Sequence, residues 1–157
     1  MDRALDSLSS AFKPLVIEVL ARLVERGVMI MIVQTSRTLA EHQANLAAGT
    51  SATTHSKHLP RKLRGIVGGT ADDEKADAID LCPYSTYALV GADKLQWATD
   101  TSPEAKTAWT AIRDIGEMLG LRSGARWRQP HDPGHLEFVF ESERANVAAE
   151  RLRNVAV

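Results

Sequence analysis

The sequence has very little cysteine, with Cys82 alone among its 157 residues. One cysteine excludes an internal disulfide framework, so packing or a bound metal must hold the fold together, and a reducing compartment suits such a chain. Cys82 shares a predicted strand face with Asp80, which would suit a metal ligand. We nevertheless interpret it as a small, buried apolar residue.

Long hydrophobic runs are also missing. The longest run, residues 28–33, is far too short to cross a bilayer. The first six residues lack the basic-then-apolar layout of a secretory signal. We therefore expect synthesis in the cytoplasm and no stable insertion into a membrane.

No charge of one sign dominates, because the formal net charge is only -1. Such a balance gives no global attraction to nucleic acid, and we expect no nucleic-acid partner. The composition is 44% hydrophobic and 25% charged, without an internal repeat or a low-complexity tract. It fits one globular domain over residues 1–157, which we expect to be a monomer.

Apolar side chains recur at three- and four-residue spacing in several segments, as in amphipathic helices. The predicted helices are residues 12–26, 39–48, 103–119 and a C-terminal tail, residues 142–157. A capping box of Thr38 and Glu41 begins the second helix, and Ser102 followed by Pro103 begins the third.

Three other segments have the pattern of strands. Residues 28–33 are uniformly apolar, which predicts a strand buried on both faces, whereas residues 76–82 and 135–140 alternate and predict half-buried strands. The order of elements lacks clean crossover units and Gly-rich phosphate loops. It therefore predicts an α+β fold with a small, mainly antiparallel sheet packed with helices.

Between residues 50 and 75 the periodicity disappears. The segment contains Ser/Thr-rich, basic, glycine-rich and acidic stretches, with only scattered apolar residues. We predict one long exposed excursion, in which the basic cluster from Arg61 to Arg64 is a solvated loop.

Polar residues that suit metal chemistry fall near the predicted strands. His58 opens the excursion, Asp80 lies on the polar face of one strand, and His135 begins another. Two imidazoles and a carboxylate are a common open ligand set for catalytic zinc, which keeps a fourth position for water. Asp132, in a Pro/Gly turn before His135, suits a general base. Spacing alone does not decide the matter, because no His-Glu-x-x-His pair is present.

Several short motifs occur together between about residues 33 and 140. They are Ser36-Arg37 with Glu41 and Gln43, Ser56-x-His58, Ala78-x-Asp80-Leu81, Trp127, and Asp132-x-x-His135-Leu136-Glu137. In this combination the chain resembles the family of zinc D-Ala-D-Ala carboxypeptidases and L-alanyl-D-glutamate endopeptidases. That family includes phage endolysins and the vancomycin-resistance dipeptidases, and it shares a fold with the hedgehog signalling domain.

The resemblance implies a role for each matching residue. His58, Asp80 and His135 become the ligands of Zn²⁺, Asp132 the general base, and Arg37 the cation that polarises the scissile carbonyl. The implied fold is the α+β fold of hedgehog and the D,D-peptidases. Residues 59–77 form an insertion, because the family usually has a short stretch between the first His and the Asp. We keep His58 as the first ligand, with His55 as the alternative, and expect the insertion to be a lid or a substrate-recognition loop.

The implied activity is hydrolysis of the L-alanyl-D-glutamate bond in peptidoglycan stem peptides by a phage or prophage endolysin that lyses bacteria. Such a protein is made in the host cytoplasm and reaches the cell wall in the periplasm after holin-like release. The alternatives are a D-Ala-D-Ala carboxypeptidase or dipeptidase, and a non-catalytic, metal-containing binding module.

Four aromatic side chains near these motifs have less specific interpretations. His42 and His131 are expected to face solvent or to contact a metal-binding residue without binding the metal themselves. Trp109 belongs to the apolar stripe of its helix and is expected in the core. Trp127 falls in the irregular approach to the site, where packing and lining of a substrate cleft are equally good explanations.

Overall fold

The computed structural model describes residues 1–51, 53–85, 95–99, 102–128 and 131–153. A four-stranded sheet lies at its centre, with the spatial order β1-β2-β4-β3 and every neighbouring pair antiparallel. The strands are β1 (Ile30–Gln34), β2 (Ala78–Pro83), β3 (Arg122–Ser123) and β4 (His135–Glu137). The predicted α+β fold with a small antiparallel sheet is confirmed.

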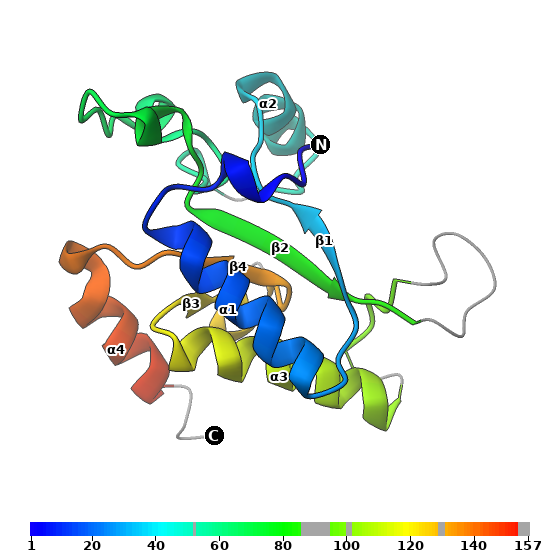
Figure 1. The fold of residues 1–157 in the computed structure, drawn as a ribbon. Coiled ribbons are helices and arrows are strands. Elements are labelled where there is room, and N and C mark those ends of the chain that lie inside the picture. The colour runs from blue at the N-terminus through cyan, green and yellow to red at the C-terminus, as the bar shows by residue number, and fades with distance from the viewer. Residues whose placement is uncertain (52, 86–94, 100–101, 129–130, 154–157) are drawn as a thin grey trace.

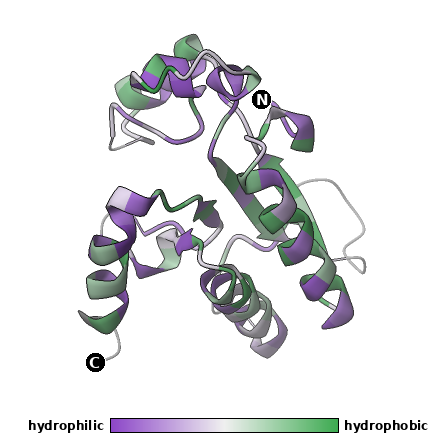
Figure 2. Cartoon of the chain, turned by 60° about the vertical axis from the view of Figure 1, so that its left-hand side comes forward, coloured by the Kyte–Doolittle hydropathy of each residue, from purple (hydrophilic) through white to green (hydrophobic). Residues whose placement is uncertain are grey.

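Helices surround this sheet (Figure 1). They are α1 (Phe12–Glu25), α2 (Leu39–Ala47), α3 (Pro103–Met118) and α4 (Arg144–Arg153). Helices α1 and α3 contact each other, and α3 also contacts β2 and β3. The main core lies between α1, α3 and the strands, where the apolar colouring of Figure 2 is concentrated. Its largest fully buried side chains include Phe12, Leu23, Ile79, Leu81, Ile112, Ile115 and Leu136.

The predicted helix starts are confirmed in atomic detail. The Thr38 hydroxyl accepts a hydrogen bond from the Glu41 backbone N–H at 3.2 Å, and the Glu41 carboxylate accepts from the Thr38 N–H at 2.9 Å. Ser102 caps α3 by accepting from the N–H of Ala105 at 3.1 Å. Both caps satisfy backbone donors that the first helical turn leaves unpaired.

The strand predictions need three corrections. Strand β1 begins at Ile30 and its apolar residues are half-buried instead of buried on both faces, because it lies at the edge of the sheet. Strand β2 is more deeply buried than an alternating strand, since Ala78 and Cys82 are buried as well and only Asp80 is partly accessible. Regular pairing of β4 ends at Glu137, so the predicted strand is too long.

The insertion at residues 59–77 is exposed over most of residues 62–71, as its composition predicts, but its two ends are largely covered. It contains two short 3₁₀ helices, Arg61–Arg64 and Ala71–Glu74. Arg61 and Arg64 are not solvated, because both guanidinium groups pair with the fully buried carboxylate of Asp77, at 2.8 and 2.5 Å. The buried carboxylate of Asp77 thus holds the first 3₁₀ helix beside the start of β2. Composition alone does not show that this acid is buried.

Four other side chains test the remaining interpretations. Cys82 belongs to the core, and burial raises the pKa of its thiol to about 11, which disfavours the thiolate that a metal ligand requires. Trp109 is also in the core, and His131 is exposed, as predicted. The prediction for His42 is wrong, because only 2% of it is exposed and its ring nitrogens make no hydrogen bond within the described residues.

The C-terminal tail is helical from Arg144 to Arg153, and residues 154–157 of the predicted tail lie outside the described part of the chain. Among the residues described, no helix is both long enough and apolar enough to cross a membrane.

Candidate metal centre

Strand pairing brings two of the predicted ligands together. In the register between β2 and β4, Asp80 lies directly opposite His135. His58 approaches from the segment before the insertion, which two backbone hydrogen bonds hold beside the sheet. The Arg37 N–H donates to the His58 carbonyl at 2.9 Å, and the Asp77 N–H donates to the Lys57 carbonyl at 2.8 Å.

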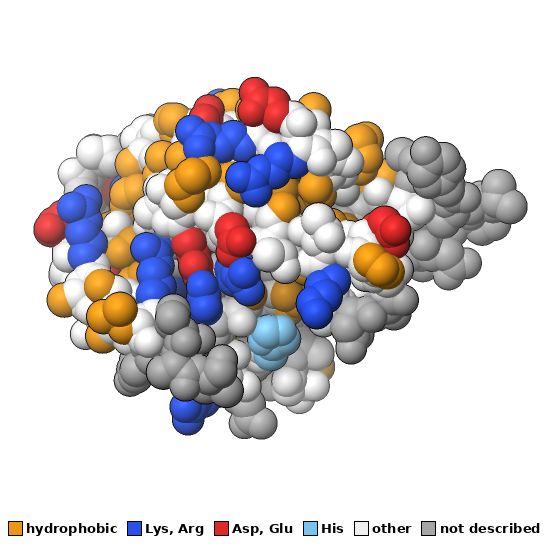
Figure 3. Space-filling model, turned by 90° about the horizontal axis from the view of Figure 1, so that it is seen from below, with side chains coloured by type: hydrophobic (Ala, Val, Ile, Leu, Met, Phe, Trp, Pro, Cys, Tyr) orange, Lys and Arg blue, Asp and Glu red, His pale blue; other side chains and the backbone are white. Residues whose placement is uncertain are grey.

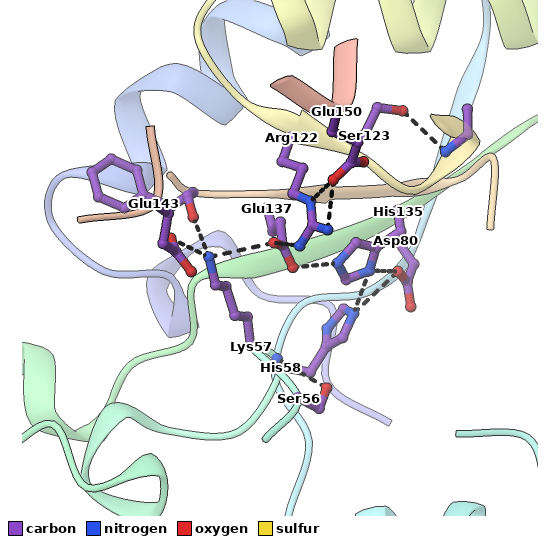
Figure 4. Close-up of polar contacts among 12 residues, drawn as sticks. Ser56, Lys57, His58, Asp80, Arg122, Ser123, His135, Glu137, Glu143 and Glu150 are labelled. Atoms are coloured by element: carbon purple, nitrogen blue, oxygen red, sulfur yellow. Dashed lines mark hydrogen bonds and ion pairs between the residues drawn. The ribbon is translucent and has the colours of Figure 1, made fainter. Parts of the chain in front are cut away.

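The three side chains converge on one point (Figure 4). The carboxylate Oδ1 of Asp80 lies 3.1 Å from Nε2 of His58 and 3.0 Å from Nδ1 of His135. The two ring nitrogens are 3.3 Å apart. The alternative ligand, His55, is exposed and does not belong to this cluster, although it lines the neighbouring cleft.

Hydrogen bonds on the far side of each ring define which nitrogen faces the cluster. Nδ1 of His58 lies 3.0 Å from the Thr35 carbonyl oxygen, which only accepts, so Nδ1 must donate. Nε2 of His135 likewise donates to the carboxylate of Glu137 at 3.2 Å. In neutral imidazoles, both nitrogens that face Asp80 then carry a lone pair.

Three acceptor atoms within 3.0–3.3 Å of one another would be stabilised by a cation between them. A tetrahedral zinc ion with bonds of about 2.0–2.1 Å separates its ligand atoms by about 3.3 Å, close to the observed spacing. The donor set, its geometry and the orientation of both rings therefore fit Zn²⁺. His58, Asp80 and His135 are therefore a candidate metal site.

The charges of the site shift its pKa values. Burial alone would raise the pKa of Asp80, but His58 and His135 outweigh it and lower that pKa below the usual aspartate range. Burial would lower the pKa of His135, but the carboxylates of Asp80 and Glu137 outweigh it and raise the pKa to about 10. The cluster thus attracts a positive charge strongly.

A cleft of about 820 Å³ opens beside this cluster. It is lined by His58, Asp80 and His135, and also by Asp132 and Arg37, which the resemblance assigns to catalysis. Basic and acidic side chains lie next to one another across the surface seen in Figure 3. None of residues 59–77, all of which the structure describes, lines the cleft, so the expectation that the insertion covers the site is not supported.

Asp132 and Arg37 are each held by local contacts. The Asp132 N–H donates to the Gly124 carbonyl, and the Asp132 carbonyl accepts from the His135 N–H, both at 3.2 Å. Burial and the negative charge of Asp80 raise the pKa of the Asp132 carboxyl, as suits a group that exchanges protons near neutral pH. The guanidinium of Arg37 donates twice to the side-chain oxygen of Gln34, at 2.9 and 2.5 Å, which fixes its direction.

Gly134 permits the close approach of the His135 turn to β2. A Cβ atom at this position would lie 2.3 Å from the Leu81 carbonyl oxygen, a backbone atom that cannot move aside. Gly134→Ala is therefore expected to destabilise the protein by about 1–3 kcal/mol and to weaken zinc binding, because it displaces His135. Urea unfolding and zinc titration check this prediction. Gly68→Ala is the matched control, since its Cβ would meet only ordinary contacts at 3.8 and 3.9 Å. Equal stability of the two variants would contradict it.

Reasoning from the sequence missed the supporting groups around His135. Glu137 lies behind the ring, and Lys57 and Arg122 pair with Glu137. One signal was present, because residues two apart in a strand share a face, which places Glu137 beside His135. The ring of Trp127 lies 4.9 Å from that of His135 between centroids, and Trp127 also lines the cleft, so packing and cleft lining both apply to it.

Comparison with solved structures supports the fold described above, whereas comparison with sequences finds no match. No protein-family model and no curated protein sequence matches the chain. The chain is thus an α+β domain in which a His-Asp-His cluster lines a cleft. Among solved structures, the chain is similar to the L-Ala D-Glu endopeptidase ChiX of Serratia marcescens. The TM-score is 0.55 at 20% identity, over 89% of this chain and 86% of that chain.

A second solved structure is a variant of the vancomycin-resistance D,D-pentapeptidase VanY from a VanB-type cassette, in complex with Zn(II). The match covers 90% of this chain and 78% of the VanY chain, at 11% identity and a TM-score of 0.49. The chain has the fold of the ChiX endopeptidase, so the resemblance read from the motifs is confirmed for the fold.

Proposed function

We propose that the protein is a zinc-dependent peptidoglycan peptidase that hydrolyses the L-alanyl-D-glutamate bond of stem peptides. The observation that carries this proposal is the convergence of His58, Asp80 and His135 beside Asp132 and Arg37 in one cleft. The likeness to ChiX, an L-Ala D-Glu endopeptidase, supports the choice of substrate and bond.

Each residue has one task in this reaction. A zinc ion at the site would supply a Lewis acid for the scissile carbonyl and lower the pKa of water. Asp132 accepts a proton from the attacking water and afterwards delivers it to the leaving amine. Arg37, fixed by Gln34, donates hydrogen bonds to the carbonyl oxygen as negative charge develops on it. Trp127 contributes an apolar wall to the cleft.

A binding module that only carries a metal is the weaker candidate. Recognition alone requires neither a carboxyl with a raised pKa nor a guanidinium in the cleft. Asp132 has the first property, and Arg37 lines the cleft. A D-Ala-D-Ala carboxypeptidase or dipeptidase would use the same metal and base, and it differs only in the bond that it cleaves.

The biological role that we propose is that of a phage or prophage endolysin. The motifs of the chain are similar to those of a family that includes such enzymes. In this role the protein is made in the bacterial host cytoplasm and reaches peptidoglycan in the periplasm after holin-like release, where it causes lysis as a monomer.

Digestion of purified Gram-negative peptidoglycan tests the activity. The zinc-loaded protein is expected to release peptides with new D-glutamate amino termini. A chelator should abolish the release and added zinc should restore it, because the metal is required for the reaction. Mass spectrometry of the peptide ends is the measurement.

The products distinguish the candidates. Loss of terminal D-alanine without new D-glutamate ends would establish the carboxypeptidase instead. Folded protein that binds zinc but cleaves no peptidoglycan would support the binding module. Cleavage that continues unchanged in chelator would overturn the role of the metal.

A further inference from the structure

Glu137 is a buried carboxylate to which the proposed reaction gives no task. Its side chain is only 7% exposed, and its Oε2 lies 3.2 Å from Nε2 of His135, on the side of the ring that faces away from Asp80 (Figure 4). His135 and Glu137 are two residues apart on β4, so both side chains leave the same face of the strand. The contact is therefore built into the strand geometry.

Two cations hold the other oxygen of this carboxylate. Oε1 of Glu137 lies 3.2 Å from Nη1 of Arg122 and 3.4 Å from Nζ of Lys57. With one oxygen bound to two cations and the other to the imidazole, Glu137 has a single orientation. A carboxylate fixed in this way determines the orientation of the ring that it contacts.

Both cations are themselves anchored by acids from the C-terminal segment. Glu143 accepts from Lys57 at 2.7 Å, just before α4 begins. Glu150, within α4, accepts from Arg122 at 2.7 Å. A continuous set of ion pairs thus joins α4 to His135, although α4 itself contributes no metal ligand.

We propose that Glu137 is a positioning residue for the metal centre, fixed by Lys57 and Arg122 and, through them, by the C-terminal segment. By accepting the proton of Nε2, it directs the lone pair of His135 Nδ1 toward the metal and prevents rotation of the ring. The proposal rests on the metal site of the proposed function. It does not depend on which peptide bond is cleaved.

A purely structural role is the alternative, in which Glu137 only neutralises Lys57 and Arg122. The two roles differ in the quantity that they affect. A counter-ion contributes to the stability of the fold, whereas a carboxylate behind a metal-binding histidine contributes about 10- to 100-fold to metal affinity. Zinc affinity of the folded protein is therefore the decisive measurement.

The experiment compares the full chain with Glu137→Gln and Glu137→Ala. Zinc dissociation constants are measured by competition with a chromophoric chelator, and circular dichroism verifies folding. We expect zinc binding about 10-fold weaker in Glu137→Gln, which keeps an acceptor oxygen, and up to about 100-fold weaker in Glu137→Ala. If Glu137→Ala does not fold, Glu137→Gln, which preserves size and shape, carries the comparison.

Glu117→Gln is the matched control. Like Glu137, Glu117 is a carboxylate bound to an arginine, since it pairs with Arg126 of the cleft wall at 2.9 Å. Its side chain is 13% exposed, and it does not belong to the cluster of candidate ligands. Its zinc affinity should equal that of the unchanged protein. Folded Glu137 variants with unchanged zinc affinity would overturn the positioning role while leaving the proposed function intact. Absence of zinc binding in the unchanged protein would overturn both.

Discussion

Asp132→Asn is expected to lower kcat/KM for stem-peptide cleavage by about 10²- to 10⁴-fold, the usual contribution of a general base. Asparagine preserves the shape of the side chain and the backbone contacts to Gly124 and His135, but its amide cannot accept the proton of the attacking water. Asp132 is not part of the ligand cluster, so zinc affinity should hardly change. Steady-state kinetics on a defined stem peptide, together with zinc titration, measure both quantities.

Asp80→Asn provides the contrast that separates a ligand from a base. Asp80 contacts both histidines, so its substitution should abolish activity by removing zinc from the protein. Asp114→Asn, at an exposed ion pair on α3, should change neither kcat/KM nor zinc affinity. If Asp132→Asn kept full activity, another group would have to be the base. If it lost zinc as completely as Asp80→Asn, its role would be in metal binding.

The sequence predicted the parts of the site that depend on local patterns. Alternation placed Asp80 and His135 on strands, and the antiparallel pairing that follows from the fold brings them face to face. His58 follows no periodic element, so it was distinguished from His55 by the Ser-x-His motif and by its place directly before the insertion. The structure brings His58 into the cluster because backbone hydrogen bonds fix its segment beside the sheet.

What the sequence did not predict depends on contacts between distant polar groups. A periodic pattern of apolar residues indicates which hydrophobic side chains are buried. It does not indicate which charged residues are buried as ion pairs. For this reason Arg61 and Arg64 resembled a solvated loop, and the support of His135 by Glu137 went unrecognised. Strand β3, with two residues, is too short to produce any pattern.

Asp77→Ala is expected to lower the free energy of unfolding by about 3–5 kcal/mol, the usual cost of removing one member of a buried ion pair. The Asp77 carboxylate is fully buried, and it accepts hydrogen bonds from Ser9, Arg61 and Arg64. Its loss leaves two guanidinium groups, 15% and 5% exposed, without their main counter-ion. Urea unfolding at neutral pH is the measurement. The cost would be a large part of the 5–15 kcal/mol that stabilises a typical domain.

The unchanged protein and Asp77→Ala are expected to differ in free energy of unfolding, and the pH dependence of that difference distinguishes loss of the ion pairs from loss of packing. Burial alone would raise the pKa of Asp77, but the hydrogen bonds from Arg61, Ser9 and Arg64 outweigh it and lower the pKa below the ordinary value. Its stabilisation is therefore complete above the unfolded-state pKa of about 3.9 and is lost as the pH falls through the lower folded-state pKa. The difference in free energy of unfolding between the unchanged protein and Asp77→Ala should be constant near neutral pH and should become smaller in acid. Asp114→Ala, at an exposed pair, should cost less than about 1 kcal/mol. An equal cost for both variants would contradict the anchoring role of Asp77, which joins the insertion to the strand that carries Asp80.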